Sequence, residues 1–137
     1  MTGGARAVLL FPGAGSGRDH PALVAIERAL APLPVVRADF PYRREGRKAP
    51  DRPAKLIACV RDEAAALADK AGIDPAGVVL GGRSMGGRMC SMAVAEGLPA
   101  AGVCAALIVA NQFSPKLGPG PPHVSVMFLL IVTCWPV

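Results

Sequence analysis

One short segment, residues 78–88, constrains the fold of this chain more than any other part of the sequence. Its first three residues are apolar and two of them are β-branched, which is typical of the end of a buried strand. Residues 82–86 read Gly-Arg-Ser-Met-Gly and match the G-x-S-x-G nucleophile elbow, a strained turn between a strand and a helix. The Met, Ala and Arg residues of 85–95 suit the helix that would follow. The segment therefore predicts a strand, a tight turn at Ser84 and a helix.

The two glycines of the motif have a steric role in this interpretation. A serine at an elbow has unusual backbone angles, and the residues two positions away on each side crowd it, so Gly82 and Gly86 cannot carry a Cβ. The helix would direct its N-terminal N–H groups toward Ser84 and toward a developing anion. The competing interpretation is that Ser84 is an ordinary turn serine in a glycine-rich stretch.

Length, composition and charge limit the other possibilities. A chain of 137 residues with 52% hydrophobic residues predicts one folded domain rather than a disordered chain. The net charge of +5 includes a basic cluster in residues 43–55. Glu45 and Asp51 interrupt this cluster and only Tyr42 adjoins it, so we interpret it as a solvated loop face that attracts anions weakly. We expect no nucleic-acid partner.

The cysteines indicate a reducing environment. The four cysteines are not paired at C-x-x-C spacing, and no histidine lies at a zinc-finger distance from them. We therefore expect core cysteines in a cytoplasmic protein, with no metal and no cofactor. The N-terminal residues lack the pattern of a signal peptide.

A second glycine-rich loop follows the first predicted strand. Residues 6–11 form an apolar run that predicts an interior parallel strand. The loop at residues 12–17 exposes backbone N–H groups, but it completes neither G-x-G-x-x-G nor the P-loop motif. In a fold with an elbow, the loop after an early strand supplies half of an oxyanion hole. A plain glycine turn is the alternative.

The remaining elements alternate between helix and strand. Asp19 is the expected N-cap of a helix over 21–30, and His20 is interpreted as a loop or cap histidine rather than a base. Further elements are expected at 35–40 (strand), 41–53 (loop), 53–71 (helix ended by Gly72) and 102–110 (strand). This order predicts an α/β fold with a parallel sheet flanked by helices.

The amino-acid composition changes after residue 110. Residues 111–123 are rich in proline and glycine, and 124–137 are nearly all apolar. The apolar run is shorter than the roughly 20 residues of a transmembrane span. We predict a domain at 1–110, and at 111–137 an atypical linker with an apolar tail that forms a buried strand or promotes self-association.

Three segments together resemble the KANSL/TEX-type α/β-hydrolase-like family, within the dienelactone-hydrolase-like group. They are Leu-Leu-Phe-Pro-Gly-Ala-Gly-Ser-Gly at 9–17, Asp-Phe-Pro-Tyr at 39–42 and Leu-Gly-Gly-Arg-Ser-Met-Gly-Gly-Arg at 80–88. The resemblance covers residue 6 to about residue 109, and the block around Ser84 is its most specific part.

The resemblance implies a serine hydrolase that acts on an acyl bond of a small-molecule substrate. Ser84 would be the nucleophile, and the N–H groups of Met85 and Ala14 would form the oxyanion hole. Arg83 and Arg88 would contact an anionic group of the substrate, or else lie on the surface or brace the elbow.

The catalytic acid and histidine of such a family are not evident. The acid and the histidine follow the serine in this fold, yet Glu96 is the only acid after Ser84 and lies along the elbow helix itself. His123 is the only later histidine, in the proline-rich stretch. We therefore expect a C-terminally incomplete hydrolase, from a truncated or frame-shifted product, with weak or absent activity. The alternatives are a non-catalytic protein-interaction module and, with least support, a nucleotide-binding domain.

Overall fold

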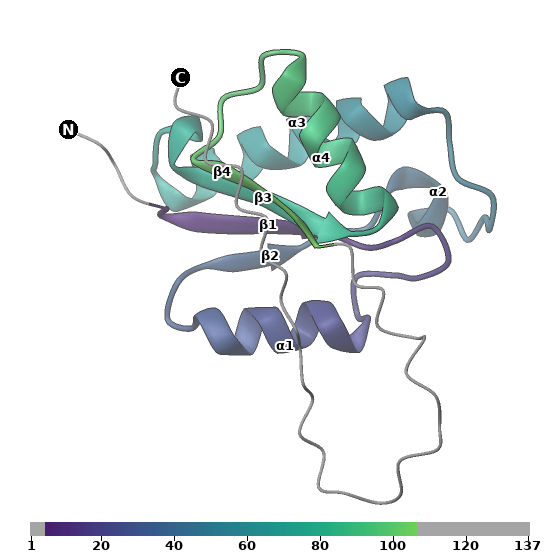
Figure 1. The fold of residues 1–137 in the computed structure, drawn as a ribbon, viewed down its shortest axis with the longest axis horizontal. Helices are drawn as coiled ribbons and strands as arrows, with labels where there is room; N and C mark the ends of the chain where they lie inside the picture. Colours follow the sequence, from purple (N-terminus) through teal and green to yellow (C-terminus); the bar gives the residue numbers. More distant parts are fainter. Residues whose placement is uncertain (1–4, 107–137) are drawn as a thin grey trace, which may run out of the picture.

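A four-stranded parallel sheet forms the centre of the computed structural model, which describes residues 5–106 (Figure 1). The strands lie in the order β2-β1-β3-β4, so β1 and β3 are the interior strands. Their bounds are β1 (Ala7–Phe11), β2 (Val35–Arg37), β3 (Val78–Arg83) and β4 (Gly102–Ala106). The α/β fold with a parallel sheet flanked by helices, predicted from the sequence, is confirmed.

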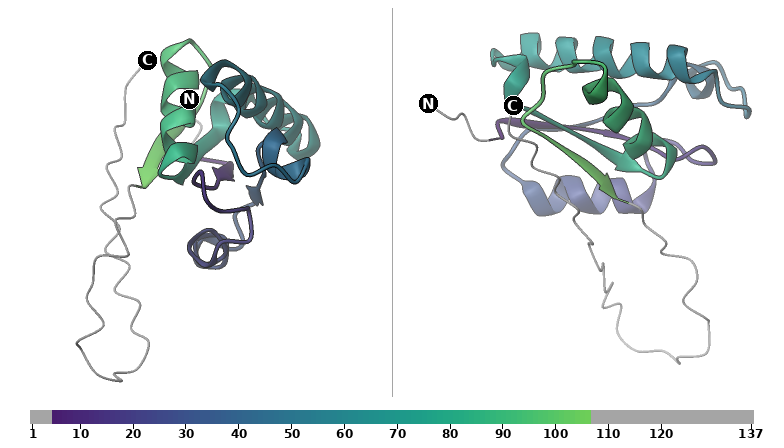
Figure 2. Two further views of the ribbon diagram at one scale, coloured as in Figure 1. Left: turned by 90° about the vertical axis from the view of Figure 1, so that its right-hand side faces the viewer. Right: turned by 45° about the horizontal axis from the view of Figure 1, so that its top comes forward.

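Helices cover both faces of this sheet. One face carries α1 (Pro21–Leu30), and the other carries α3 (Pro53–Ala71) and α4 (Met85–Ala95), as Figures 1 and 2 show. Two short helical segments complete the fold, α2 (Pro41–Arg44) and the 3₁₀ helix η1 (Pro75–Gly77). No helix within residues 5–106 is long and apolar enough to cross a membrane.

The side chains of β1 explain why this strand is central. All five of its residues are buried. Because successive side chains of a strand point to opposite faces, Leu9 and Phe11 join the core beneath α3 and α4, while Val8 and Leu10 pack with Leu23 of α1. A strand covered by helices on both faces must be apolar throughout, as this one is.

The register of the sheet brings the carboxyl ends of β1, β2 and β3 to the same side of the sheet. Phe11, the last residue of β1, pairs with Gly82 near the end of β3, and Leu10 pairs with Arg37 at the end of β2. The chain runs from β1 outward to β2 and then returns to β3 on the other side of β1. The carboxyl ends of β1 and β3 therefore flank a topological switch point, where open α/β sheets bind their ligands.

Several predicted boundaries agree with the structure. The helices at 21–30, 53–71 and 85–95 have the expected bounds. Gly72 ends α3 in the left-handed conformation, with φ of 64°, as a C-cap glycine does. Cys59 and Cys90 are buried free thiols, as expected of core cysteines.

Other predictions about local structure were wrong. The predicted strand 35–40 ends at Arg37, and the predicted loop 41–53 begins with the one-turn helix α2, because Pro41 fits the first turn of a helix. Asp19 is not the cap of α1: His20 occupies that position, and its Nδ1 accepts the N–H of Ala22 at 3.1 Å. The tail, with the domain boundary at residue 110, lies outside the described residues.

Burial predicts that truncating two different leucines will change the free energy of unfolding by very different amounts. Leu80 of β3 is fully buried, whereas Leu30 at the end of α1 is 39% exposed. We expect Leu80→Ala to lower the free energy of unfolding by about 2–5 kcal/mol, because it removes buried methyl groups and leaves a cavity. Leu30→Ala is the matched control and should cost about 1 kcal/mol or less. Urea denaturation of both variants measures the difference, and equal losses would contradict the assigned core.

Candidate functional site

The backbone of Ser84 is strained. Its φ of 50° and ψ of −114° make it the one non-glycine residue with positive φ between residues 5 and 106. Such a conformation costs about 1–3 kcal/mol and persists only where the surrounding structure enforces it. Ser84 is exposed and directly precedes the first residue of α4. Its side chain makes no capping hydrogen bond to that helix, so the hydroxyl is not occupied by the backbone of α4.

Two glycines press the elbow against the end of β1. A Cβ on Gly82 would lie 2.5 Å from the carbonyl oxygen of Phe11, and 2.8 Å from backbone atoms of Gly86 and Gly87. A Cβ on Gly86 would collide with the carbonyl oxygens of Phe11 and Pro12. Real Cβ atoms do not approach backbone this closely, so both positions require glycine. The crowding comes from the carbonyl end of β1 and from Gly86 and Gly87, and not from Ser84 as the sequence predicted.

The glycine-rich loop after β1 lies directly beside the serine. A Cβ on Gly13 would lie 3.5 Å from Cβ of Ser84 and 3.4 Å from the carbonyl oxygen of Arg83. Within residues 5–106, the Ala14 N–H has no hydrogen-bond acceptor. Ala14 and Met85 therefore belong to the two segments that meet at Ser84, where the predicted oxyanion hole would be.

A buried tyrosine, for which no role was predicted from the sequence, holds this loop in place. The hydroxyl of Tyr42 donates to the carbonyl oxygen of Ala14 at 3.0 Å. The ring is fully buried and stacks on Phe40, which stacks in turn on Phe11. Burial raises the pKa of Tyr42, so the hydroxyl keeps its proton and remains a donor. The resemblance at residues 39–42 included this tyrosine, but its partner 28 positions earlier could not be predicted from local sequence.

His20 lies near the elbow but is oriented as a cap. Burial lowers its pKa, and the positive charge of Arg83 lowers it further. Because Nδ1 accepts the N–H of Ala22, the neutral ring carries its proton on Nε2. His20 therefore has no free nitrogen lone pair with which to take a proton from Ser84. The interpretation of His20 as a cap histidine is confirmed.

The other predicted site residues are dispersed. Arg83 is half-buried, and its Nε has no hydrogen-bond partner within the described part of the chain. Arg88 is exposed on α4. Glu96 follows α4 and pairs with Arg61 at 3.4 Å, and at about 1.5 Å per residue it lies roughly 18 Å along the helix from Ser84. His123 lies outside the described residues.

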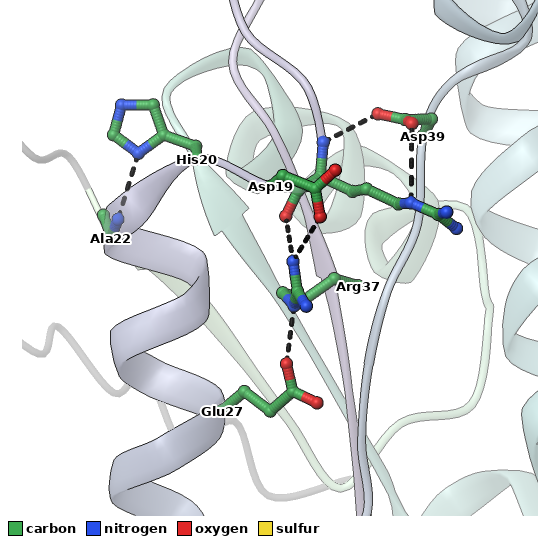
Figure 3. A network of polar contacts seen from close by, with 7 residues as sticks. Asp19, His20, Ala22, Glu27, Arg37 and Asp39 are labelled. Carbon is green, nitrogen blue, oxygen red and sulfur yellow. Dashed lines mark hydrogen bonds and ion pairs between the residues drawn. The ribbon is translucent and has the colours of Figure 1, made fainter.

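An ion-pair network lies at the carboxyl ends of β1 and β2 (Figure 3). Arg37 donates to Glu27 at 2.6 Å and to Asp19 at 2.9 Å. Asp39 accepts the backbone N–H of Arg18 at 2.7 Å. These contacts join the segment that follows the glycine-rich loop to α1 and β2. Residues 5–106 contain no group of three or more His, Cys, Asp or Glu side chains placed to hold a metal ion.

A comparison with protein families agrees with the α/β fold. The family model described as an alpha/beta hydrolase domain matches residues 4–116 of the chain. The chain therefore belongs to this alpha/beta hydrolase domain family. Searches among curated proteins and among solved structures gave no match.

The requirement for glycine at the elbow gives a direct prediction. Gly86→Ala should lower the free energy of unfolding by more than about 2 kcal/mol, because its Cβ would overlap two backbone carbonyls. Gly15→Ala in the neighbouring loop is the matched control. Its Cβ meets nothing within 4 Å, so we expect almost no change. Thermal unfolding followed by circular dichroism compares the two, and a stable Gly86→Ala protein would argue against the close approach.

The environment of His20 predicts its titration. The folded protein resists protonation of this ring, so we expect its NMR titration midpoint below the ordinary 6.5. Because the folded pKa is the lower one, His20 supports folding above the unfolded pKa, and this contribution is lost as the pH falls from about 6.5. A His123→Gln variant isolates the His20 signal. A midpoint above 6.5 would refute the described environment.

Proposed function

We propose that this chain is a serine hydrolase domain that acts on acyl bonds of the ester type, with Ser84 as the nucleophile. One observation carries the proposal: the exposed Ser84 is held in a strained conformation between a glycine-rich loop and the start of α4. Strain of this kind has a cost, and a turn that served only to connect β3 to α4 would not need it. The family assignment supports a hydrolase.

The proposed oxyanion hole consists of the N–H groups of Ala14 and Met85. The Ala14 N–H is unoccupied in the described part of the chain, and Met85 is the first residue of α4, where the helix dipole adds positive potential. During attack, the Ser84 Oγ bonds to the carbonyl carbon and the carbonyl oxygen becomes an anion. Two donors placed beforehand would stabilise that anion, and losing one such donor costs about 10²–10³ in rate in well-studied enzymes.

We propose that turnover is slow. The serine needs a base for its proton and an acid to orient that base. His20 has its Nδ1 occupied, and Glu96 is paired with Arg61 far along α4. His123 is the remaining candidate for the base in this proposal. Without a base, an oxyanion hole and binding alone give about 10³–10⁴ over the uncatalysed reaction.

Three finer assignments belong to the same proposal. We place the chain in the KANSL/TEX-type group, on the strength of the extended elbow sequence at 80–88. We retain the division at residue 110 between the hydrolase-like domain and the tail. A cytoplasmic location is supported by the free buried thiols of Cys59 and Cys90.

A fluorophosphonate probe tests whether Ser84 is activated. In labelling, Oγ attacks phosphorus, fluoride leaves, and the serine proton passes to a base or to water. We expect slow labelling of the full chain that Ser84→Ala abolishes. Ser91→Ala is the matched control, because Ser91 lies on the same helix and donates to the carbonyl of Gly87 at 3.1 Å. It should label at the rate of the natural chain.

The outcome also separates the two functional hypotheses. Labelling at Ser84 that His123→Gln abolishes would identify the base. A folded chain that does not label at all would contradict the hydrolase proposal and favour the alternative, a hydrolase-like module that contacts other proteins without catalysis.

A further inference from the structure

An open cavity of about 520 Å³ lies beyond the glycine-rich loop. Its volume is within the range of about 300–1,000 Å³ of small-molecule sites. Four of its lining side chains are cationic and two are carboxylates. The cations are Arg18, Arg43, Arg47 and Lys48, and the carboxylates are those of Asp19 and Asp39.

The cavity is close to the elbow because both use the same loop. A Cβ on Gly13 would lie 3.5 Å from Cβ of Ser84, and Gly17 of the same loop lines the cavity. Four residues span at most about 14 Å even when fully extended, and a turn between Ser16 N–H and the Gly13 carbonyl shortens this path. The positive charge of Arg83, which precedes Ser84, also lowers the pKa of His20 in the cavity wall. A small molecule could therefore reach both places at once.

The carboxylates of the wall already have cationic partners. Asp39 accepts the backbone N–H of Arg18 at 2.7 Å and its side chain lies 3.9 Å from the Arg18 guanidinium. Asp19 pairs with Arg37 at 2.9 Å, as Figure 3 shows. Within residues 5–106, neither acid forms an ion pair with Arg43 or Lys48.

Among the other cations that line the cavity, Arg47 has acidic partners, but Arg43 and Lys48 have none within the described residues. Arg47 pairs with Glu45 at 2.6 Å and with Asp51 at 2.9 Å. Within residues 5–106, Arg43 and Lys48 form no ion pair. Arg43 is half-buried, and its Nη2 would lie 3.6 Å from a Cβ placed on Gly17. The same Cβ would lie 3.4 Å from Oδ1 of Asp39, so the guanidinium and this carboxylate border the cavity on either side of Gly17.

We propose that this cavity binds an oxyanion, a carboxylate or phosphate group of a small molecule, through Arg43 and Lys48. Arg43 supplies a planar fork that matches two oxygens of such a group, and Lys48 supplies a mobile point charge. The substrate half of the inference rests on the proposed hydrolase function: the anion would be one end of the acyl substrate whose carbonyl reaches Ser84. Arg83 and Arg88 were predicted from the resemblance either to contact a substrate anion or to lie on the surface or brace the elbow, and neither lines this cavity.

Direct binding tests the site without reference to catalysis. Isothermal titration of the full-length chain with inorganic pyrophosphate, and separately with succinate, should show binding that weakens between low and physiological salt. The double variant Arg43→Gln, Lys48→Gln should lose at least tenfold in affinity. The matched control is Arg28→Gln, Lys70→Gln, which removes the same charge from exposed ends of α1 and α3 and should bind as the natural chain does.

The two probes and the two variants give distinct outcomes. Binding of pyrophosphate alone identifies a phosphate site, and binding of succinate alone identifies a carboxylate site. If neither probe binds, or if both double variants bind equally, the inference is overturned. Circular dichroism of both variants shows that they are folded.

A pair of esters then tests the substrate half. We expect the double variant to lower kcat/KM at least tenfold for mono-p-nitrophenyl glutarate, which is anionic, and to leave p-nitrophenyl acetate unchanged. Equal loss on both esters would overturn the assignment of the anion to the substrate. If the natural chain binds an anion but hydrolyses neither ester, the hydrolase proposal fails while the anion site stands.

Discussion

The approach of the elbow to the carbonyl end of β1 is the contact on which the rest of the site depends. Gly82 and Gly86 bring the backbone around Ser84 against the carbonyl oxygens of Phe11 and Pro12, at distances that no side chain permits. This contact fixes the direction of α4 relative to β1. It also forces the strained angles of Ser84, since the turn has no room to relax toward an ordinary conformation.

The same edge of the sheet is organised from a second side by the aromatic stack. Phe11, Phe40 and Tyr42 lie one on another beneath the loop, and the Tyr42 hydroxyl holds the Ala14 carbonyl. A hydrogen bond of this kind contributes only about 1 kcal/mol. Its structural effect is larger, because it fixes a glycine-rich loop that would otherwise have great conformational freedom. The loop and the elbow are therefore positioned by separate parts of the core.

Much of this arrangement could be predicted from the sequence because it depends on short-range patterns. The apolar run of β1, the 3.6-residue periodicity of α3 and the glycines around Ser84 each report their own local structure. The parallel sheet follows from the alternation of strands and helices. The strained turn at Ser84 and the glycines that flank it could therefore be predicted from the sequence.

What could not be predicted depends on contacts between distant residues. The bond from Tyr42 to Ala14 spans 28 positions, and Asp39 reaches back 21 positions to the N–H of Arg18. His20 is the cap of α1 because the helix starts at Pro21, and Asp19, one position earlier, pairs with Arg37 of β2. The basic cluster was interpreted as a uniform loop face. The structure divides it instead into cations with acidic partners, such as Arg47, and cations without, such as Arg43 and Lys48 within residues 5–106.

The backbone conformation of Ser84, measured in a crystal structure of the full-length chain, tests the central claim most directly. The account predicts a positive φ near 50° at Ser84, with Gly13 packed against its Cβ. An ordinary helical φ of about −60° at Ser84, with the glycines separated from the Phe11 carbonyl, would show that the turn is unstrained and would contradict the account.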